Sequence, residues 1–275
     1  MTNRPKAFSV SYSRMSCFRR CLQQYHWRYI DKYYPPFSMG QVRGSAGHAA
    51  LASWHTKYEE EAALQAAWSK WVSEGFTQNE EWDLLSVSLT RYFSWSRAND
   101  TFKLLEAEKR FDIQYLSDGK PCILTGYIDG IVEEKDGRIW LLENKFYKRM
   151  DGSGLEMDQQ VSTYLLAAHT IQHAAVGVIY NMVRVADTKI AVTEPVVRKR
   201  IFRNPAGLRK IETEMLSQVA NMLRYQEGGE PYRNATKDCH WDCSFYSACL
   251  SMLDDGQVPT EILQSLSNTR STENG

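Results

Sequence analysis

Hydrophobic residues in the first hundred positions recur three or four residues apart, which is the period of an amphipathic helix. This spacing predicts a first helix over residues 9–34, which Pro35 and Pro36 end because proline cannot continue a helix. It also predicts a second helical region over residues 44–72 and a third over residues 82–99. The first part of the chain is therefore expected to be helical.

From about residue 104 the apolar positions alternate with polar ones, which is typical of half-buried strands. Strands are predicted over residues 104–115, 122–134 and 138–147, with a hairpin turn between the last two. There follow a helix over 154–172, strands over 175–184 and 196–203, and a helix over 204–226. Helices, an antiparallel meander, a crossover helix and further strands predict an α/β fold with a central mixed β-sheet flanked by helices.

Composition adds limits to this picture. Of the 275 residues, 43% are hydrophobic and 24% are charged, which is typical of a soluble globular protein. The 33 basic and 33 acidic residues balance, so any binding of nucleic acid must depend on local patches of charge. No apolar run approaches the roughly 18 residues of a membrane span, and the first residues lack the apolar segment of a signal peptide. We therefore expect an intracellular, cytoplasmic protein without a membrane partner.

Charged side chains follow a strand that reads as buried, in the segment WLLENKFYKRM. Glu143 and Lys145 lie two residues apart and therefore on one face of that strand. The hairpin could bring Asp129, on the preceding strand, close to Glu143. Two carboxylates can hold Mg²⁺ or Mn²⁺, and the lysine could orient a water or stabilise charge on a phosphate. The alternative is a surface aspartate in a turn and a salt bridge at the end of a strand.

An acidic residue on one strand, followed by acidic-x-Lys on the next, resembles the signature of the PD-(D/E)xK nuclease superfamily. Asp129, Glu143 and Lys145 stand at its positions. The resemblance implies a restriction-endonuclease-like core that hydrolyses phosphodiester bonds with Mg²⁺ or Mn²⁺. Asn144 replaces the apolar or aromatic residue common between the acid and the lysine, and its backbone carbonyl is the implied metal ligand there.

Three further segments resemble the RecB-like branch of that superfamily. In QVSTY, Gln160 and Tyr164 match a Q-x-x-x-Y motif, which implies that they contact the DNA backbone or brace the site. In GSAGHAAL, His48 matches an additional metal ligand on a helix, and the small residues at 44–47 would allow close packing beside it. In EAEKRFDI, Glu108 matches a catalytic glutamate that precedes a phenylalanine.

Cysteines lie near both ends of the chain. Cys239, Cys243 and Cys249 form a C-x3-C-x5-C run, and Cys21 stands far upstream. This resembles the iron–sulfur branch of the RecB-like nucleases, which includes AddB-type helicase-nuclease subunits, CRISPR-associated RecB-like exonucleases and phage homologues. The resemblance implies a [4Fe–4S] cluster held by these four thiolates, although the first gap is commonly two residues. Four thiolates also suit Zn²⁺, and Cys17 could replace Cys21.

The resemblance extends over residues 9–250 and implies one nuclease domain over residues 1–255. Its parts would be a helical segment over 9–100, a catalytic core over 104–203 and a helix with the cysteine segment over 204–250, followed by a polar, disordered tail over 256–275. We expect an exonuclease on single-stranded DNA or duplex ends that serves recombination, repair or phage DNA processing. If it is phage-encoded, it would act in the host cytoplasm.

Two alternatives remain at this stage. One is a DNA-binding scaffold without catalysis, and the other is a zinc-stapled interaction subunit of a recombination complex. The chain lacks a G-x-x-x-x-G-K-[ST] phosphate-binding loop, so it is not itself a helicase, although it could work beside a helicase or a recombination protein. Basic residues that could bind phosphates cluster after residue 197, at Arg198, Lys199, Arg200, Arg203, Arg209 and Lys210.

Overall fold

The computed structural model describes residues 7–171, 173–186, 189, 192–256 and 260–266. These residues form two compact units. The larger unit contains Ser38–Tyr115 and Ile123–Met215, and the smaller one contains Met1–Phe37, Leu116–Cys122 and Leu216–Gly275. The prediction of a single domain over residues 1–255 stays a prediction.

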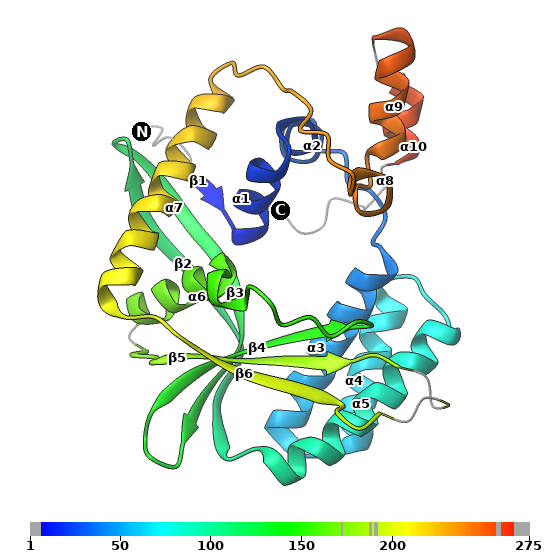
Figure 1. Ribbon diagram of the computed structural model, residues 1–275, viewed down its shortest axis with the longest axis vertical. Coiled ribbons are helices and arrows are strands. Elements are labelled where there is room, and N and C mark those ends of the chain that lie inside the picture. Colours follow the sequence, from blue (N-terminus) through cyan, green and yellow to red (C-terminus); the bar gives the residue numbers. More distant parts are fainter. Residues whose placement is uncertain (1–6, 172, 187–188, 190–191, 257–259, 267–275) are drawn as a thin grey trace, which may run out of the picture. The chain divides into compact units, whose positions relative to one another are not determined.

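A mixed β-sheet runs through the larger unit (Figure 1). Its strands are β2 (Phe102–Ser117), β3 (Lys120–Glu134), β4 (Ile139–Tyr147), β5 (Gly177–Arg184) and β6 (Val196–Phe202). The order is β3-β4-β5-β6, and β2 also pairs with β3. The β3–β4 and β5–β6 pairs are antiparallel, whereas β4 and β5 are parallel.

Helices complete the larger unit. They are α3 (Met39–Lys57), α4 (Glu60–Ser73), α5 (Glu80–Asn99), α6 (Gln159–Thr170) and the first part of α7 (Pro205–Gln226). Figure 1 shows α3, α4 and α5 packed together beside the sheet. Helix α6, preceded by the 3₁₀ turn Leu155–Met157, connects β4 to β5, because two parallel strands require a crossover. The predicted mixed sheet flanked by helices is confirmed. No described helix combines the length and the apolar character needed to cross a membrane.

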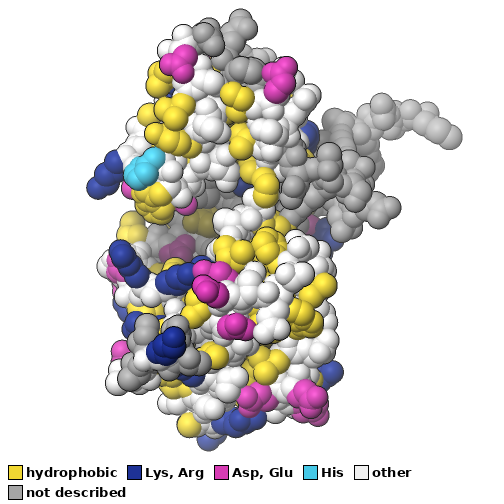
Figure 2. All heavy atoms as spheres, turned by 90° about the vertical axis from the view of Figure 1, so that its right-hand side faces the viewer, with side chains coloured by type: hydrophobic (Ala, Val, Ile, Leu, Met, Phe, Trp, Pro, Cys, Tyr) yellow, Lys and Arg dark blue, Asp and Glu magenta, His cyan; other side chains and the backbone are white. Residues whose placement is uncertain are grey.

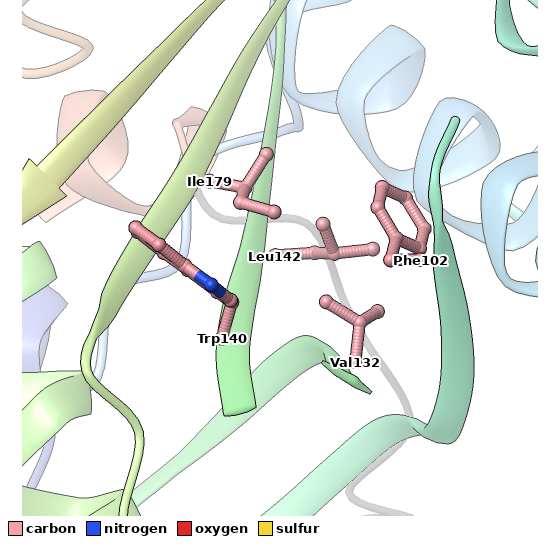
Figure 3. Packing of buried hydrophobic residues seen from close by; sticks show 5 residues of the cluster. All are labelled: Phe102, Val132, Trp140, Leu142 and Ile179. Atoms are coloured by element: carbon pink, nitrogen blue, oxygen red, sulfur yellow. The ribbon is translucent and has the colours of Figure 1, made fainter. Parts of the chain in front are cut away.

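A cluster of buried hydrophobic residues fixes the register of the central strands (Figure 3). Val132 of β3 lies opposite Trp140 of β4, and Leu142 of β4 lies opposite Ile179 of β5. Because side chains alternate along a strand, the burial of Leu142 in this cluster directs the next residue, Glu143, to the opposite face of the sheet.

The N-terminal part of the smaller unit differs from the single helix predicted over residues 9–34. It contains β1 (Phe8–Val10), α1 (Tyr12–Arg20), α2 (Leu22–Tyr25) and a π-helical turn (His26–Ile30). Helix α1 ends at Cys21, whose backbone is extended with φ −163° and ψ 119°. The apolar period continues across this break, so the pattern alone gave no sign of it.

The C-terminal part of the smaller unit contains α8 (Cys239–Asp242), α9 (Tyr246–Asp255) and α10 (Thr260–Ser265). Trp27, Phe245, Ala248 and Leu263 form a buried cluster here. Part of the predicted disordered tail is therefore helical, because Leu263 is buried in that cluster; residues 267–275 lie outside the described chain. Figure 2 shows apolar side chains at the surface. Trp241 of α8 is 68% exposed.

Candidate functional site

Three potential metal ligands converge in the larger unit. His48 lies on α3, Glu108 on β2 and Asp129 on β3, and one ligand atom from each lies within 4.8 Å of the other two. The Nδ1 of His48 is 3.2 Å from Oδ1 of Asp129. An imidazole and two carboxylates in this arrangement suit a divalent cation that accepts nitrogen and oxygen ligands.

A close approach of helix α3 to strand β4 brings His48 to this position. A Cβ added at Gly47 would lie 2.2 Å from the ring of Phe146, so only glycine allows the observed packing. The ring of His48 contacts the same phenylalanine, edge to face, with centroids 6.0 Å apart. Gly44, by contrast, has open space around its Cβ position. The predicted role of the small residues in close packing is therefore wrong for Gly44.

Glu108 has an unusual backbone conformation for a strand residue. Its φ is 47°, in the left-handed region that non-glycine residues adopt only at a cost. Phe102 is buried at an even position, whereas Phe111 and Ile113 are buried at odd positions. The inward face therefore changes phase between them, as it does where a β-bulge inserts one extra residue. This irregularity separates Glu108 from Glu106, which regular alternation would place on the same face.

Glu106 has partners of its own, away from the metal ligands. Its carboxylate accepts from His173 Nε2 at 2.9 Å and from Lys109 Nζ at 2.5 Å. Of the two glutamates in this strand, only Glu108 lies with His48 and Asp129. The metal ligands predicted from the sequence omitted Glu108, for which only a catalytic role was expected.

Glu143 is a buried carboxylate with unusual surroundings. It is 2% exposed, and its neighbour is the ammonium group of Lys145, with which it forms an ion pair. Apart from this ammonium, neither of its oxygens has a hydrogen-bond partner in the described chain. Burial, together with the negative charge of Asp129, raises the pKa of Glu143 above its usual range. Unpartnered buried oxygens are costly, and a cation beside them would remove that cost.

The charges of the neighbouring groups shift the other pKa values. Burial disfavours the charged form of Lys145, but the Glu143 carboxylate outweighs it and raises the lysine pKa. Burial likewise opposes ionisation of Asp129, but His48 and the backbone N–H of Asn144 lower its pKa. That N–H donates to Asp129 Oδ2 at 2.7 Å. The resulting site combines an ionised aspartate with a protonated lysine.

Helix α6 contributes two polar side chains to the site. Lys145 Nζ donates to Oε1 of Gln160 at 3.2 Å, and Nε2 of Gln160 donates to the hydroxyl of Tyr164 at 3.0 Å. The two residues lie four positions apart and so share one face of the helix. The structure thus brings the predicted Q-x-x-x-Y residues to the lysine.

The residues present fit a bound Mg²⁺ or Mn²⁺. Three ligand groups within 4.8 Å of one another, together with the Glu143 carboxylate that is paired only with Lys145 among the described residues, provide nitrogen and oxygen ligands. His48, Glu108, Asp129 and Glu143 are the side chains that would hold the ion. The side chain of Asn144 is buried and is not among these ligands. Its backbone carbonyl remains a predicted ligand.

All four predicted cluster cysteines line one cavity of the smaller unit. Cys21, Cys239, Cys243 and Cys249 line it together with apolar and basic side chains that include Trp27, Phe245, Leu250, Leu253, Arg20 and Arg233. No disulfide links the described cysteines. The break of the helix at Cys21 places this residue at the cavity, whereas Cys17, one turn earlier in α1, is not among the lining residues.

Backbone N–H groups point at the cysteine sulfurs. Asn234 N–H donates to Sγ of Cys21 at 3.4 Å, and Thr236 N–H donates to Sγ of Cys239 at 3.3 Å. Burial, reinforced by the neighbouring thiols, raises the pKa of Cys249 to about 11. Crowded thiols with N–H donors are typical of cysteines that deprotonate only when a metal or cluster takes up their charge.

The predicted basic patch is largely committed to internal contacts. Arg198 pairs with Asp100 and Arg200 with Glu134, while Lys199 donates to the carbonyl of Gly152. Arg198, one of the residues that could have bound phosphate, is instead mostly buried against that aspartate. Side-chain partners of this kind cannot be read from a run of basic residues.

Comparisons with known proteins agree with this architecture. A model of the PD-(D/E)XK nuclease superfamily matches residues 9–250. The crystal structure named "Putative exonuclease" from Eubacterium rectale is similar with a TM-score of 0.52 and 13% identity, over 85% of this chain and 88% of that one. The crystal structure of SSO0001 is similar over 88% of this chain and 86% of that one, with a TM-score of 0.43 and 15% identity. No curated protein matches at a significant level.

Proposed function

We propose that this chain, which belongs to the PD-(D/E)XK nuclease superfamily, is a Mg²⁺- or Mn²⁺-dependent deoxyribonuclease that acts on single-stranded DNA or duplex ends. The observation that carries the proposal is the convergence of His48, Glu108 and Asp129 within 4.8 Å. The ion pair of Glu143 and Lys145 lies in the same site, since both groups shift the pKa values of its other members.

Each side chain has a role that its contacts support. His48, Glu108, Asp129 and Glu143 would hold the ion, which when bound supplies a Lewis acid and a more acidic water. Lys145 remains charged because the Glu143 carboxylate raises its pKa, and it can orient the attacking water or stabilise charge on the phosphate. Gln160 holds the lysine from the side of α6.

For the cysteine cavity we propose a [4Fe–4S] cluster held by Cys21, Cys239, Cys243 and Cys249. A tetrahedral zinc ion with Zn–S bonds of about 2.3 Å holds its sulfurs about 3.8 Å apart. Four thiolates suit either group, and the support for the [4Fe–4S] cluster is the cysteine spacing that resembles the iron–sulfur branch of the RecB-like nucleases. The cluster would tie together segments from near the two ends of the chain and reduce the entropy of the unfolded state.

The finer biological role rests on the RecB-like motifs alone. They support a DNA-processing enzyme of recombination, repair or phage replication that acts beside a helicase or a recombination protein. The balanced charge of the chain and the internal pairing of Arg198 and Arg200 argue against tight binding of DNA by bulk charge.

The direct test is a cleavage assay with protein purified without oxygen. End-labelled single- and double-stranded DNA are incubated with the protein and Mn²⁺, and the products are resolved by length. We expect metal-dependent release of short products, abolished by Lys145→Ala in a variant that folds as the parent does. Metal-dependent binding of DNA without cleavage would instead identify the non-catalytic scaffold.

A further inference from the structure

Three polar side chains form one rung across the central sheet of the larger unit. Asn144 of β4 pairs in register with Asn181 of β5, and Asn181 pairs with Arg198 of β6. This rung lies two residues beyond the apolar rung of Leu142 and Ile179 in Figure 3, and therefore on the same face. An apolar face thus gives way to a polar one, on the side of the sheet opposite Glu143.

Side-chain hydrogen bonds connect the members of this rung. Asn181 Nδ2 donates to Oδ1 of Asn144 at 2.9 Å, and Arg198 Nε donates to Oδ1 of Asn181 at 2.6 Å. Asn181 is fully buried, and Asn144 is 3% exposed. Leaving a buried amide without hydrogen-bond partners is costly, so these bonds persist in the folded chain.

The far end of the rung is anchored by a buried ion pair. Arg198 Nη2 donates to Oδ1 of Asp100 at 2.7 Å, and its guanidinium lies over the ring of Trp95 at 4.6 Å. Asp100 also accepts from the hydroxyl of Ser96 and is 3% exposed through its side chain. The arginine therefore has little freedom to turn away from Asn181.

The near end of the rung is Asp129. Asn144 Nδ2 lies 3.5 Å from Oδ2 of Asp129, the oxygen that also accepts the backbone N–H of Asn144 at 2.7 Å. The other oxygen, Oδ1, faces His48. One carboxylate oxygen is thus held by the backbone of Asn144 and contacted by its side chain, while the other is directed toward His48.

The direction of every bond in the rung follows from its two ends. Arginine can only donate hydrogen bonds, so Asn181 must present its oxygen to Arg198 and its amino group to Asn144. Asn144 must then accept with its oxygen and present its own amino group to Asp129, whose ionised carboxylate can only accept. Arg198 therefore sets the orientation of both amides.

We propose that Asn181 and Arg198 are positioning residues that fix the Asp129 carboxylate for metal binding, through the amide of Asn144. This inference rests on the proposed function, since it assumes that Asp129 binds the ion. Residues behind a metal ligand typically contribute ten- to a hundredfold to metal affinity by orienting that ligand. A rung that only fills the interior would affect stability and leave metal affinity unchanged.

The decisive substitution is Asn181→Asp. A carboxylate at this position still accepts from Arg198 but cannot donate to Asn144, so the amide of Asn144 turns and presents its oxygen to Asp129. Two acceptors then face each other, and the carboxylate is displaced. A matched control is Arg200→Met: Arg200 lies two residues further along β6, where it pairs with Glu134 and lies over Trp140 outside the rung.

The experiment measures Mn²⁺ affinity without DNA, by the loss of the electron paramagnetic resonance signal of free Mn²⁺. The Asp129→Asn variant, which lacks one proposed ligand, measures the Mn²⁺ that binds elsewhere on the protein. Thermal unfolding is recorded for each apo protein. We expect Asn181→Asp to weaken Mn²⁺ binding about tenfold and Arg200→Met to leave it unchanged. Parental Mn²⁺ affinity in folded Asn181→Asp protein would overturn the inference. If the parent binds no Mn²⁺ at this site, the proposed function itself is overturned.

A second variant covers the case in which Asn181→Asp does not fold. Arg198→Lys keeps a cation beside Asp100 and withdraws the Nε donor from Asn181. We expect this variant to bind Mn²⁺ several-fold more weakly than the parent. Its circular dichroism spectrum should match that of the parent, which shows that it is folded. Unchanged Mn²⁺ affinity in this folded variant would overturn the inference on its own.

Discussion

The ammonium group of Lys145 donates to Oε1 of Gln160 at 3.2 Å, across the junction of strand β4 and helix α6. Tyr164, one turn further along the helix, accepts from the amide nitrogen of the same glutamine at 3.0 Å. Because the tyrosine takes the nitrogen end of the amide, the oxygen end is left to face the lysine. The glutamine and tyrosine thus act on the lysine by positioning it.

Replacement of Gln160 by leucine should lower kcat about ten- to a hundredfold and change KM little, since the lysine loses the group that orients it. Steady-state cleavage of labelled DNA measures both constants. Gln159→Leu is the matched control, because the neighbouring side chain points about 100° away around the helix. Equal effects of the two substitutions on kcat would contradict a positioning role for Gln160.

Gly47→Ala and Gly44→Ala should have opposite effects on stability. A methyl group at Gly47 meets the ring of Phe146 at 2.2 Å, and we expect a loss of about 1–3 kcal/mol together with weaker Mn²⁺ binding through His48. The methyl group at Gly44 meets open space within a helix, so a gain of about 0.5–1 kcal/mol is expected. Urea denaturation of both variants gives the comparison. A neutral Gly47→Ala would mean that α3 and β4 are not packed this closely.

Glu108→Gly and Glu108→Ala both remove the carboxylate, but only glycine adopts a φ of 47° without strain. The glycine variant should therefore be more stable than the alanine variant by about 1 kcal/mol, while both lose Mn²⁺ affinity to a similar degree. Paired unfolding curves and Mn²⁺ titrations test this. An alanine variant as stable as the glycine variant would show that the strand is regular at this position.

Cys21→Ser and Cys17→Ser separate the two cysteines of the first helical segment. Of these two cysteines, only Cys21 lines the cysteine cavity. Its replacement should therefore remove most of the iron and the broad absorbance near about 400 nm. Cys17→Ser should retain both. Iron analysis of protein purified without oxygen provides the measurement. Loss of iron in Cys17→Ser alone would assign the fourth ligand to that residue.

The pH dependence of stability should show that His55 is neutral in the folded chain. This histidine is buried, and its Nε2 is hydrogen-bonded to the hydroxyl of Tyr92 at 2.9 Å. Burial lowers the pKa of His55 from 6.5 to about 4. As the pH falls through this window, the unfolded chain binds a proton that the folded chain does not, so the free energy of unfolding falls. The shift corresponds to at most about 3 kcal/mol, lost between pH 6.5 and pH 4.

The control for this pH effect is His55→Gln, which keeps a polar group beside Tyr92 but does not titrate. Its free energy of unfolding should fall less steeply between pH 6.5 and pH 4 than that of the parent. Parallel curves for the two proteins would contradict a buried, neutral His55. Carboxylates that titrate in the same window affect both proteins alike and cancel in the comparison.

Much of the sheet and the acidic core could be predicted from the sequence. Alternation of apolar residues located the strands, and the short turn before β4 implied that Asp129 and Glu143 share a hairpin. These predictions depend on local periodicity, and the register of Gly130 with Leu142 agrees with them. That His48 and Gln160 lie near these acidic residues could be predicted only from the family resemblance, because no local pattern relates their helices to β4.

Other features depend on contacts that a pattern cannot encode. The left-handed backbone of Glu108 is one such feature, because glutamate is not a residue type that favours a positive φ. Asn181 reads as one polar residue in a buried strand, and its partnership with Asn144 follows only from the register of β4 and β5. The break at Cys21 interrupts a helical period that the residues themselves maintain.

The most direct test of the account is a crystal of the protein soaked in Mn²⁺ and measured at a wavelength where manganese scatters anomalously. We predict an anomalous peak within bonding distance of His48 Nδ1 and Asp129 Oδ1, with Glu108 or Glu143 completing the protein ligands. A protein that is saturated with Mn²⁺ yet shows no peak among these side chains would contradict the proposed active site.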